Sequence, residues 1–306
     1  MTNEQKKFVR RGLEQLKSIF GVDEESSSQD NKELIMTIYM HMIAYAYDDR
    51  EKIDKTDDEI LEIARKTVRR NTPDSNVGKV LKCKPETAQR LNLLRQDTSD
   101  EGIKKWGIEF SRFILENTRN AICHGSFKIN DDGTITIEDS TPNNPFEITY
   151  DFDCLCETCE ELADKEQLMY YRELLDHLKQ NTKTDLNDSK NKLVYFDLLI
   201  NLLLSYNEKE VNRSSNLINK VNELYGTSLD LERIKHIRNS VTHHYRCFPE
   251  GDDENIIILD YRDKNRDRMS SNFTLDFNKI IDFSKKFSID RLFTPNQNPE
   301  NLRGEE

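Results

Sequence analysis

A six-residue pattern, Arg-Asn-x-x-x-His, occurs twice in this chain, and the same series of elements surrounds both copies. The first copy runs from Arg119 to His124, and the second runs from Arg238 to His243, 119 positions later. Each copy closes an amphipathic helical stretch and is followed by two short strands of alternating apolar residues. Repetition of a whole series of elements predicts that the chain folds as two similar halves.

Turn residues join the two strands in each half. In the first half, residues 126–130 and 134–137 flank the turn Asp-Asp-Gly at 131–133, and Asp-Gly between alternating strands favours a hairpin. In the second half, residues 245–248 and 256–259 flank a longer turn that contains Pro249 and Gly251. We therefore predict a small hairpin directly after each motif helix.

Similar residues also begin a later helix in each half. The four residues 149–152 and the four residues 274–277 both place Thr and Asp at positions that cap a helix, and they lie 125 positions apart. We predict one helix from about residue 151 to 180 and another that begins near residue 277.

Two nearly continuous apolar runs precede the motifs and predict central, buried helices. They cover residues 33–47 and 192–206 and lie 159 positions apart, whereas the motifs lie 119 apart. The first half therefore carries about 40 additional residues, at positions 57–98, between its buried helix and its motif helix. This insertion is the main difference predicted between the halves.

Basic residues concentrate in the insertion, although the whole chain carries a formal net charge of −12. That total charge argues against a protein that coats nucleic acid through its overall field. Two interpretations of the basic cluster stay open: a surface that follows the phosphates of RNA beside the active site, or a solvated helical face. The candidate RNA-binding residues are Arg65, Lys66, Arg69, Arg70, Lys82 and Lys84.

The composition of the 306 residues, 35% hydrophobic and 33% charged, is typical of a helix-rich globular protein. We predict a mainly α fold made of tandem helical bundles. Their expected boundaries are 1–182 for the first domain, 183–191 for a linker, 192–294 for the second domain and 295–306 for a flexible tail. Because charges interrupt the first 20 residues and every apolar run is short, we expect a cytoplasmic protein without a membrane segment.

The two motifs resemble those of the HEPN superfamily, whose catalytic members carry an arginine, often a polar residue directly after it, and a histidine separated from the arginine by four to six residues. The resemblance covers Arg119, Asn120 and His124 in the first half and, in the second half, Arg238, Asn239 and His243. It implies a helical bundle and a metal-independent ribonuclease whose two motifs form one composite site, across a dimer or between two domains. Relatives with one motif are common among prokaryotic toxins, abortive-infection proteins and antiphage systems.

The residue types of the motifs suit phosphodiester chemistry without a metal or another cofactor. A histidine exchanges protons near neutral pH, and an arginine presents a charged planar fork to phosphate oxygens. One histidine would accept the proton of a ribose 2′-hydroxyl, the other would assist the leaving oxygen, and the arginines would stabilise the phosphate. The asparagines would orient the imidazoles or the backbone. We expect 2′,3′-cyclic phosphate ends.

Other interpretations stay open. The same fold could bind RNA without cutting it, and Cys154, Cys156 and Cys159 could hold zinc in a helical scaffold, although reduced, partly buried thiols are the simpler expectation. For Arg246, just after the second motif, the sequence leaves open a phosphate contact or a surface position. Expected partners are RNA, a second copy of the chain if the motifs point apart, and an antitoxin or activator protein.

Overall fold

The computed structural model describes a helical core with strands at two of its edges. The described residues are 3–22, 31–48, 85–86, 89, 96–97, 99, 101–102, 105, 113, 116–122, 125–130, 134–139, 146–151, 166–180, 182–205, 222, 231–242, 246–252, 254–259 and 273–286. In these residues helices predominate, and two three-stranded antiparallel sheets accompany them. In this part of the chain the predicted helix-rich fold is confirmed, and each predicted hairpin is present within a three-stranded sheet.

The first two helices are joined by polar contacts at the start of the second one. Helix α1 spans Asn3–Ile19 and α2 spans Lys32–Asp48. The side chain of Gln15 accepts a hydrogen bond from the backbone N–H of Leu34 at 2.8 Å and donates one to Glu33 Oε2 at 2.8 Å. Because the first N–H groups of a helix have no partner within the helix, Gln15 both caps α2 and fixes its place on α1.

The second predicted central helix is present as α9, Ser189–Ile200, continued by a π-helical turn η2, Asn201–Ser205. The carboxylate of Asp188 accepts a hydrogen bond from the N–H of Lys190 and caps the start of α9, inside the predicted linker. Seven consecutive residues, 194–200, are buried in α9, and residues 36–42 are all buried in α2. The prediction that both apolar runs form buried helices is confirmed.

Three further helices complete the described core: α8, Glu166–Lys179; α12, Leu231–Thr242; and α13, Phe277–Lys286. Helix α2 packs on α8, α1 packs on α9 and η2, and α12 packs on η2 and α9. At Gly12 of α1, an added Cβ would lie only 2.8 Å from Leu202 Cδ2, so the glycine permits the close approach of α1 to η2.

The buried apolar side chains of both halves belong to one hydrophobic cluster. It joins residues such as Leu16 and Ile38 with Phe196 and Ile237 from the other half. The predicted domain boundaries stay a prediction, and the predicted tail and the insertion around 57–98 lie outside the described residues, apart from a few isolated positions. What the fold establishes is that the halves share a core.

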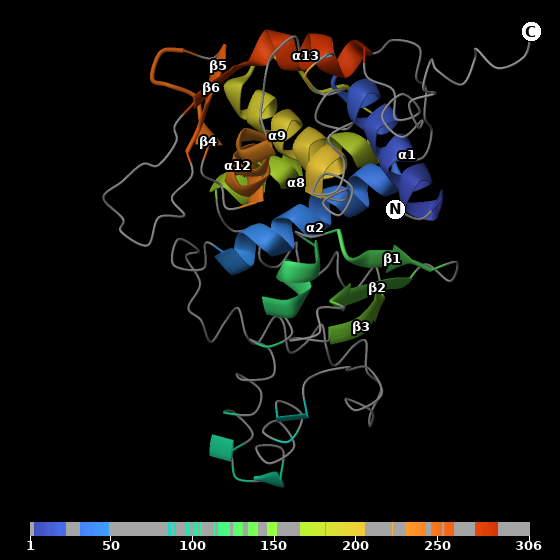
Figure 1. Ribbon diagram of the computed structural model, residues 1–306. Helices are drawn as coiled ribbons and strands as arrows, with labels where there is room; N and C mark the ends of the chain where they lie inside the picture. Colours follow the sequence, from blue (N-terminus) through green and yellow to red (C-terminus); the bar gives the residue numbers. More distant parts are fainter. Residues whose placement is uncertain are drawn as a thin grey trace, which may run out of the picture.

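Each half carries an antiparallel sheet of three strands in sequential order. In the first, β1, Phe127–Ile129, pairs with β2, Thr134–Asp139, which pairs with β3, Phe146–Asp151. In the second, β4, Arg246–Cys247, pairs with β5, Asn255–Ile258, which pairs with β6, Phe273–Asp276. The two sheets lie on different sides of the helical core, with α2 beside the first sheet and α13 beside the second (Figure 1).

The third strand of each sheet corrects the sequence interpretation. Residues 149–152 were expected to begin a helix, but residues 146–151 form β3, in which Ile148 faces the core opposite Ile137. The capping residues were correctly placed in the second half, where α13 begins at Phe277 and Asp276 Oδ1 accepts a hydrogen bond from Lys279 N at 3.2 Å. Apolar or aromatic residues alternate with polar ones in this segment, a pattern compatible with a strand, and here pairing with β2 decides the structure.

Candidate functional site

The first motif lies at the end of a short helical segment, residues 116–122, whose termination is well defined. The N–H of Gly125 donates to the carbonyl of Ile122 at 3.0 Å, and the N–H of Ser126 donates to that of Ala121 at 2.7 Å. Gly125 has a φ of 62°, a backbone conformation that favours glycine, and this pair of hydrogen bonds is the usual end of a helix before a glycine. The chain then enters β1.

In both motifs the arginine is bonded to the asparagine that follows it. Arg119 Nη1 donates a hydrogen bond to Asn120 Oδ1 at 2.7 Å, and Arg238 Nη2 donates one to Asn239 Oδ1 at 3.0 Å. Both arginines and Asn120 are half-buried, and Asn239 is buried. The structure therefore brings the arginine and asparagine of each motif together in the same way in both halves.

This contact has a direct chemical meaning. A guanidinium held by a side-chain amide loses rotational freedom before any ligand arrives, so less entropy is lost when it binds a phosphate. In each motif the asparagine oxygen accepts a hydrogen bond from the arginine. The expected role of the asparagine beside an imidazole stays a prediction, because both motif histidines lie outside the described residues.

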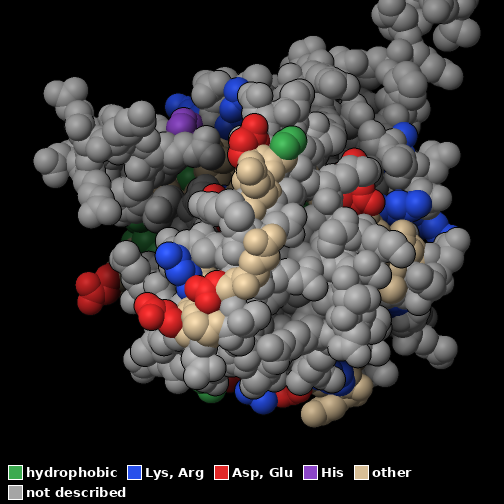
Figure 2. All heavy atoms as spheres, turned by 90° about the horizontal axis from the view of Figure 1, so that it is seen from below, with side chains coloured by type: hydrophobic (Ala, Val, Ile, Leu, Met, Phe, Trp, Pro, Cys, Tyr) green, Lys and Arg blue, Asp and Glu red, His purple; other side chains and the backbone are tan. Residues whose placement is uncertain are grey.

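The remaining predicted site residues lie outside the described part of the chain. These are the two motif histidines, the candidate basic residues and the three clustered cysteines: His124, His243, Arg65, Lys66, Arg69, Arg70, Lys82, Lys84, Cys154, Cys156 and Cys159. Among the described residues, no three His, Cys, Asp or Glu side chains gather as metal ligands would. On the face shown in Figure 2, coloured basic and acidic side chains are interspersed.

Sequence reasoning missed a buried polar network between the two halves. Its centre is Asp197 of α9, which is 0% exposed. Arg246 Nε donates to Asp197 Oδ1 at 2.7 Å, and Arg246 Nη2 donates to Asp197 Oδ2. Tyr171 of α8 also donates to Asp197 Oδ2, at 2.5 Å. Three hydrogen bonds thus satisfy a carboxylate that burial would otherwise make very costly.

His41 of α2 extends this network to the first half. Asn201 Nδ2 can only donate, so its 2.5 Å contact with His41 Nδ1 makes that nitrogen an acceptor and leaves the ring proton on Nε2. Nε2 lies 3.8 Å from Asp197 Oδ2. Burial lowers the pKa of His41 to about 4, a shift opposed by Asp197 and reinforced by Arg246. The imidazole is therefore neutral at physiological pH.

The polar residues of the network have apolar counterparts in the other half. The central helices are 159 residues apart, and at this spacing Asp197 corresponds to Ile38 and Asn201 to Met42. The motifs are 119 residues apart, and at this spacing Arg246 corresponds to Phe127. Those three apolar residues are buried, and the ring of Phe127 packs edge-on against Phe8 with centroids 5.6 Å apart. The network therefore distinguishes the second half from the first.

Two sequence features could have revealed this network. An aspartate and a histidine interrupt the apolar runs, and charged or ionisable residues at buried positions are nearly always paired. Both interpretations that the sequence left open for Arg246 are wrong, since its side chain is 6% exposed and bound to Asp197. The partner could not be identified because it lies 49 residues earlier.

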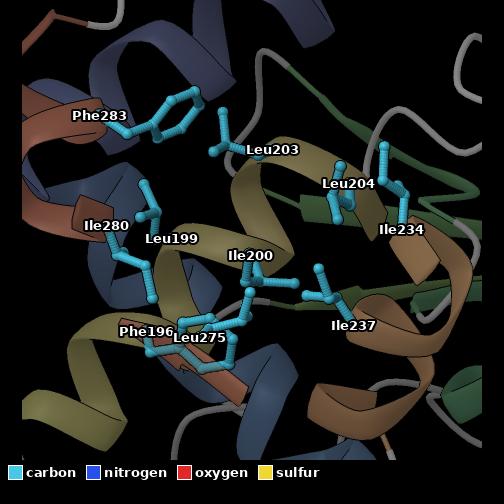
Figure 3. A pocket seen from close by; sticks show the side chains of 10 residues that line it. All are labelled: Phe196, Leu199, Ile200, Leu203, Leu204, Ile234, Ile237, Leu275, Ile280 and Phe283. Atoms are coloured by element: carbon cyan, nitrogen blue, oxygen red, sulfur yellow. The ribbon is translucent and has the colours of Figure 1, made fainter. Parts of the chain in front are cut away.

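A small apolar cavity of about 50 Å³ lies behind the second motif helix. Its walls come from α9, η2, α12, β6 and α13 and include Leu199, Ile237 and Phe283, whose side chains point toward a common space in Figure 3. Every residue of the lining is apolar, so the cavity offers no group that would orient a polar substrate.

Comparison with family models, curated proteins and solved structures gave no match. None of the helices in the described residues combines the length and the apolar character required to cross a membrane. The assignment of a function therefore depends on the two motifs and on their structural surroundings.

Proposed function

We propose that this protein is a metal-independent endoribonuclease of the HEPN type, built from tandem helical bundles and active in antiphage defence or as a toxin. The observation that carries the proposal is the equivalent Arg–Asn hydrogen bond, Arg119 to Asn120 and Arg238 to Asn239. Each pair comes at the end of a helix that leads into a three-stranded antiparallel sheet. Two matching arginine sites support a composite site for a single phosphodiester.

In the proposed reaction one motif histidine, His124 or His243, takes the proton from a ribose 2′-hydroxyl. The 2′-oxygen attacks the adjacent phosphorus, and the bond from phosphorus to the 5′-oxygen breaks. The other histidine gives a proton to that leaving oxygen. Arg119 and Arg238 neutralise the charge on the pentavalent phosphate. The products are a 2′,3′-cyclic phosphate and a 5′-hydroxyl, and DNA is resistant because it lacks the 2′-hydroxyl.

The decisive experiment is cleavage of total cellular RNA in EDTA by the wild-type chain and by His124→Ala/His243→Ala, followed by analysis of the RNA ends. Cyclic phosphate ends made by the wild type alone would support the proposal. His177→Ala is a suitable control, because His177 is exposed on α8 and lies in neither motif. RNA binding without cleavage by the wild type would instead favour a non-catalytic RNA-binding module of the same fold.

A further inference from the structure

We infer that Asp197 is a positioning residue for the second motif and acts through Arg246. This inference rests on the proposed ribonuclease function and names a group that neither touches RNA nor belongs to the motif. Asp197 holds the first residue of β4, and β4 begins immediately beyond the segment that contains the motif histidine.

The connection between α12 and β4 is short in sequence, so the two elements are closely linked. Helix α12 ends at Thr242 and β4 begins at Arg246, and only three residues, including His243, lie between them. On the helical side, Asn239, Ser240 and Val241 are buried. On the strand side, the Arg246 side chain is 6% exposed and bound to Asp197. With a reach of about 3.5 Å per residue, so short a connection limits how far β4 can shift relative to α12.

Packing alone does not explain the ion pair. In the first half, Ile38 and Phe127 occupy the corresponding positions and are buried without charge. A buried ion pair is generally no more stable than well-packed apolar residues of similar volume. What it adds is direction, because a planar guanidinium with two hydrogen bonds to one carboxylate has a defined orientation that an apolar contact lacks.

The carboxylate is itself held in place from several sides. Tyr171 of α8 donates to Asp197 Oδ2, and His41 of α2 lies 3.8 Å from the same oxygen. Helices α2, α8 and α9 therefore form a fixed base, to which Arg246 attaches the strand that follows the second motif. A fixed base is required of a positioning residue, since a mobile carboxylate would not define the place of its partner.

The test compares full-length Asp197→Asn with the wild type by RNA-cleavage kinetics and by amide hydrogen exchange. We expect kcat to fall on the order of 10- to 100-fold with KM within about threefold, because misplaced catalytic groups slow the reaction more than they weaken binding. Amide exchange in residues 239–247 should rise about tenfold, while that in residues 120–128 stays unchanged. The first motif thus serves as an internal control.

Two further variants make the result specific. Arg246→Lys keeps the charge but loses the planar fork, so the same local increase in exchange is expected even if Asp197→Asn does not fold. Met169→Ala changes an exposed side chain of α8 that makes no contact with Asp197, so it should keep kcat within about threefold.

Equal loosening of both motif regions, or unchanged exchange at residues 239–247 in both variants, would overturn the inference. If the wild type does not cleave RNA, the proposed function fails, and the positioning role is then judged from hydrogen exchange alone.

Discussion

Arg246 and Asp197 form a buried bidentate pair that ties the strand after the second motif to the central helix α9. Asp197→Ala should lower the free energy of unfolding by about 3–5 kcal/mol, because it leaves the Arg246 charge buried without its carboxylate. Asp197→Ile/Arg246→Phe, which introduces the residue types of the first half, should recover most of this loss. Urea unfolding of the wild type and both variants measures the two effects. A double variant no more stable than the single one would show that the halves do not pack alike here.

Stability should fall in mild acid because of His41. Its folded pKa is about 4 and its ordinary value is 6.5, so between these values the unfolded chain binds a proton that the folded chain does not. The contribution is fully present above pH 6.5 and is lost as the pH falls to about 4. It amounts to about 3 kcal/mol over this window. Urea unfolding at several pH values should show a smaller decrease for His41→Gln than for the wild type, and equal decreases would contradict the assignment.

The motif arginines should be equivalent in catalysis. Arg119→Ala and Arg238→Ala are each expected to lower kcat on the order of 100-fold or more, because each removes a charge that stabilises the phosphate in the transition state. Lysine at either position should restore little, since it cannot form the planar fork that Asn120 and Asn239 orient. Single-turnover cleavage of a short RNA measures these losses, with the exposed Arg172→Ala as control. Full activity of both alanine variants would remove the arginines from the reaction.

The site should form within one chain, because the helices of both halves pack in one core. A mixture of His124→Ala and His243→Ala chains should therefore be inactive. In a site shared between two chains, such a mixture would contain dimers with one intact pair of motifs. Recovery of more than about a tenth of wild-type cleavage on mixing, with dimers seen by light scattering, would establish assembly across two chains.

The apolar cavity behind α12 should make truncation of its lining costly. Leu199 is 1% exposed and lines the cavity. Leu199→Ala should lower the free energy of unfolding by about 3–5 kcal/mol. This is the upper part of the usual range for Leu→Ala, because the substitution enlarges a cavity that is already present. Met169 is 48% exposed, and Met169→Ala should change stability by less than about 0.5 kcal/mol. Chemical denaturation measures both values. A cost below about 1 kcal/mol for Leu199→Ala would show that the surrounding helices close on the space.

Local patterns in the sequence were sufficient to predict much of the fold. The apolar runs predicted α2 and α9, and the turn at residues 131–133 predicted the pairing of β1 with β2, because each signal is contained in neighbouring residues. The third strand of each sheet was not predicted. Residues 146–151 become a strand through pairing with β2, and such pairing between separate segments is not visible in local composition.

The difference between local signals and contacts of separate segments also explains what was predicted of the candidate site. The motif was found because its residues are close in the sequence, but the hydrogen bond from Arg119 to Asn120 was not anticipated. The Asp197 network was missed because its members come from five separate elements and meet only in the folded chain. Arg246 lies close to a motif rich in phosphate-binding residues, which suggested a phosphate contact or a surface position. Its side chain is buried instead, because it binds the carboxylate of Asp197, 49 residues earlier in the chain.

The core shared by the two halves limits how this chain can be divided into fragments. Since α1 and α2 both pack on α9, cutting between the halves would expose apolar surface on both fragments. The two halves therefore depend on each other for a common core. Each motif can then specialise, and a change in one copy need not be matched in the other, as the buried Asp197–Arg246 pair, which has apolar counterparts in the first half, already illustrates.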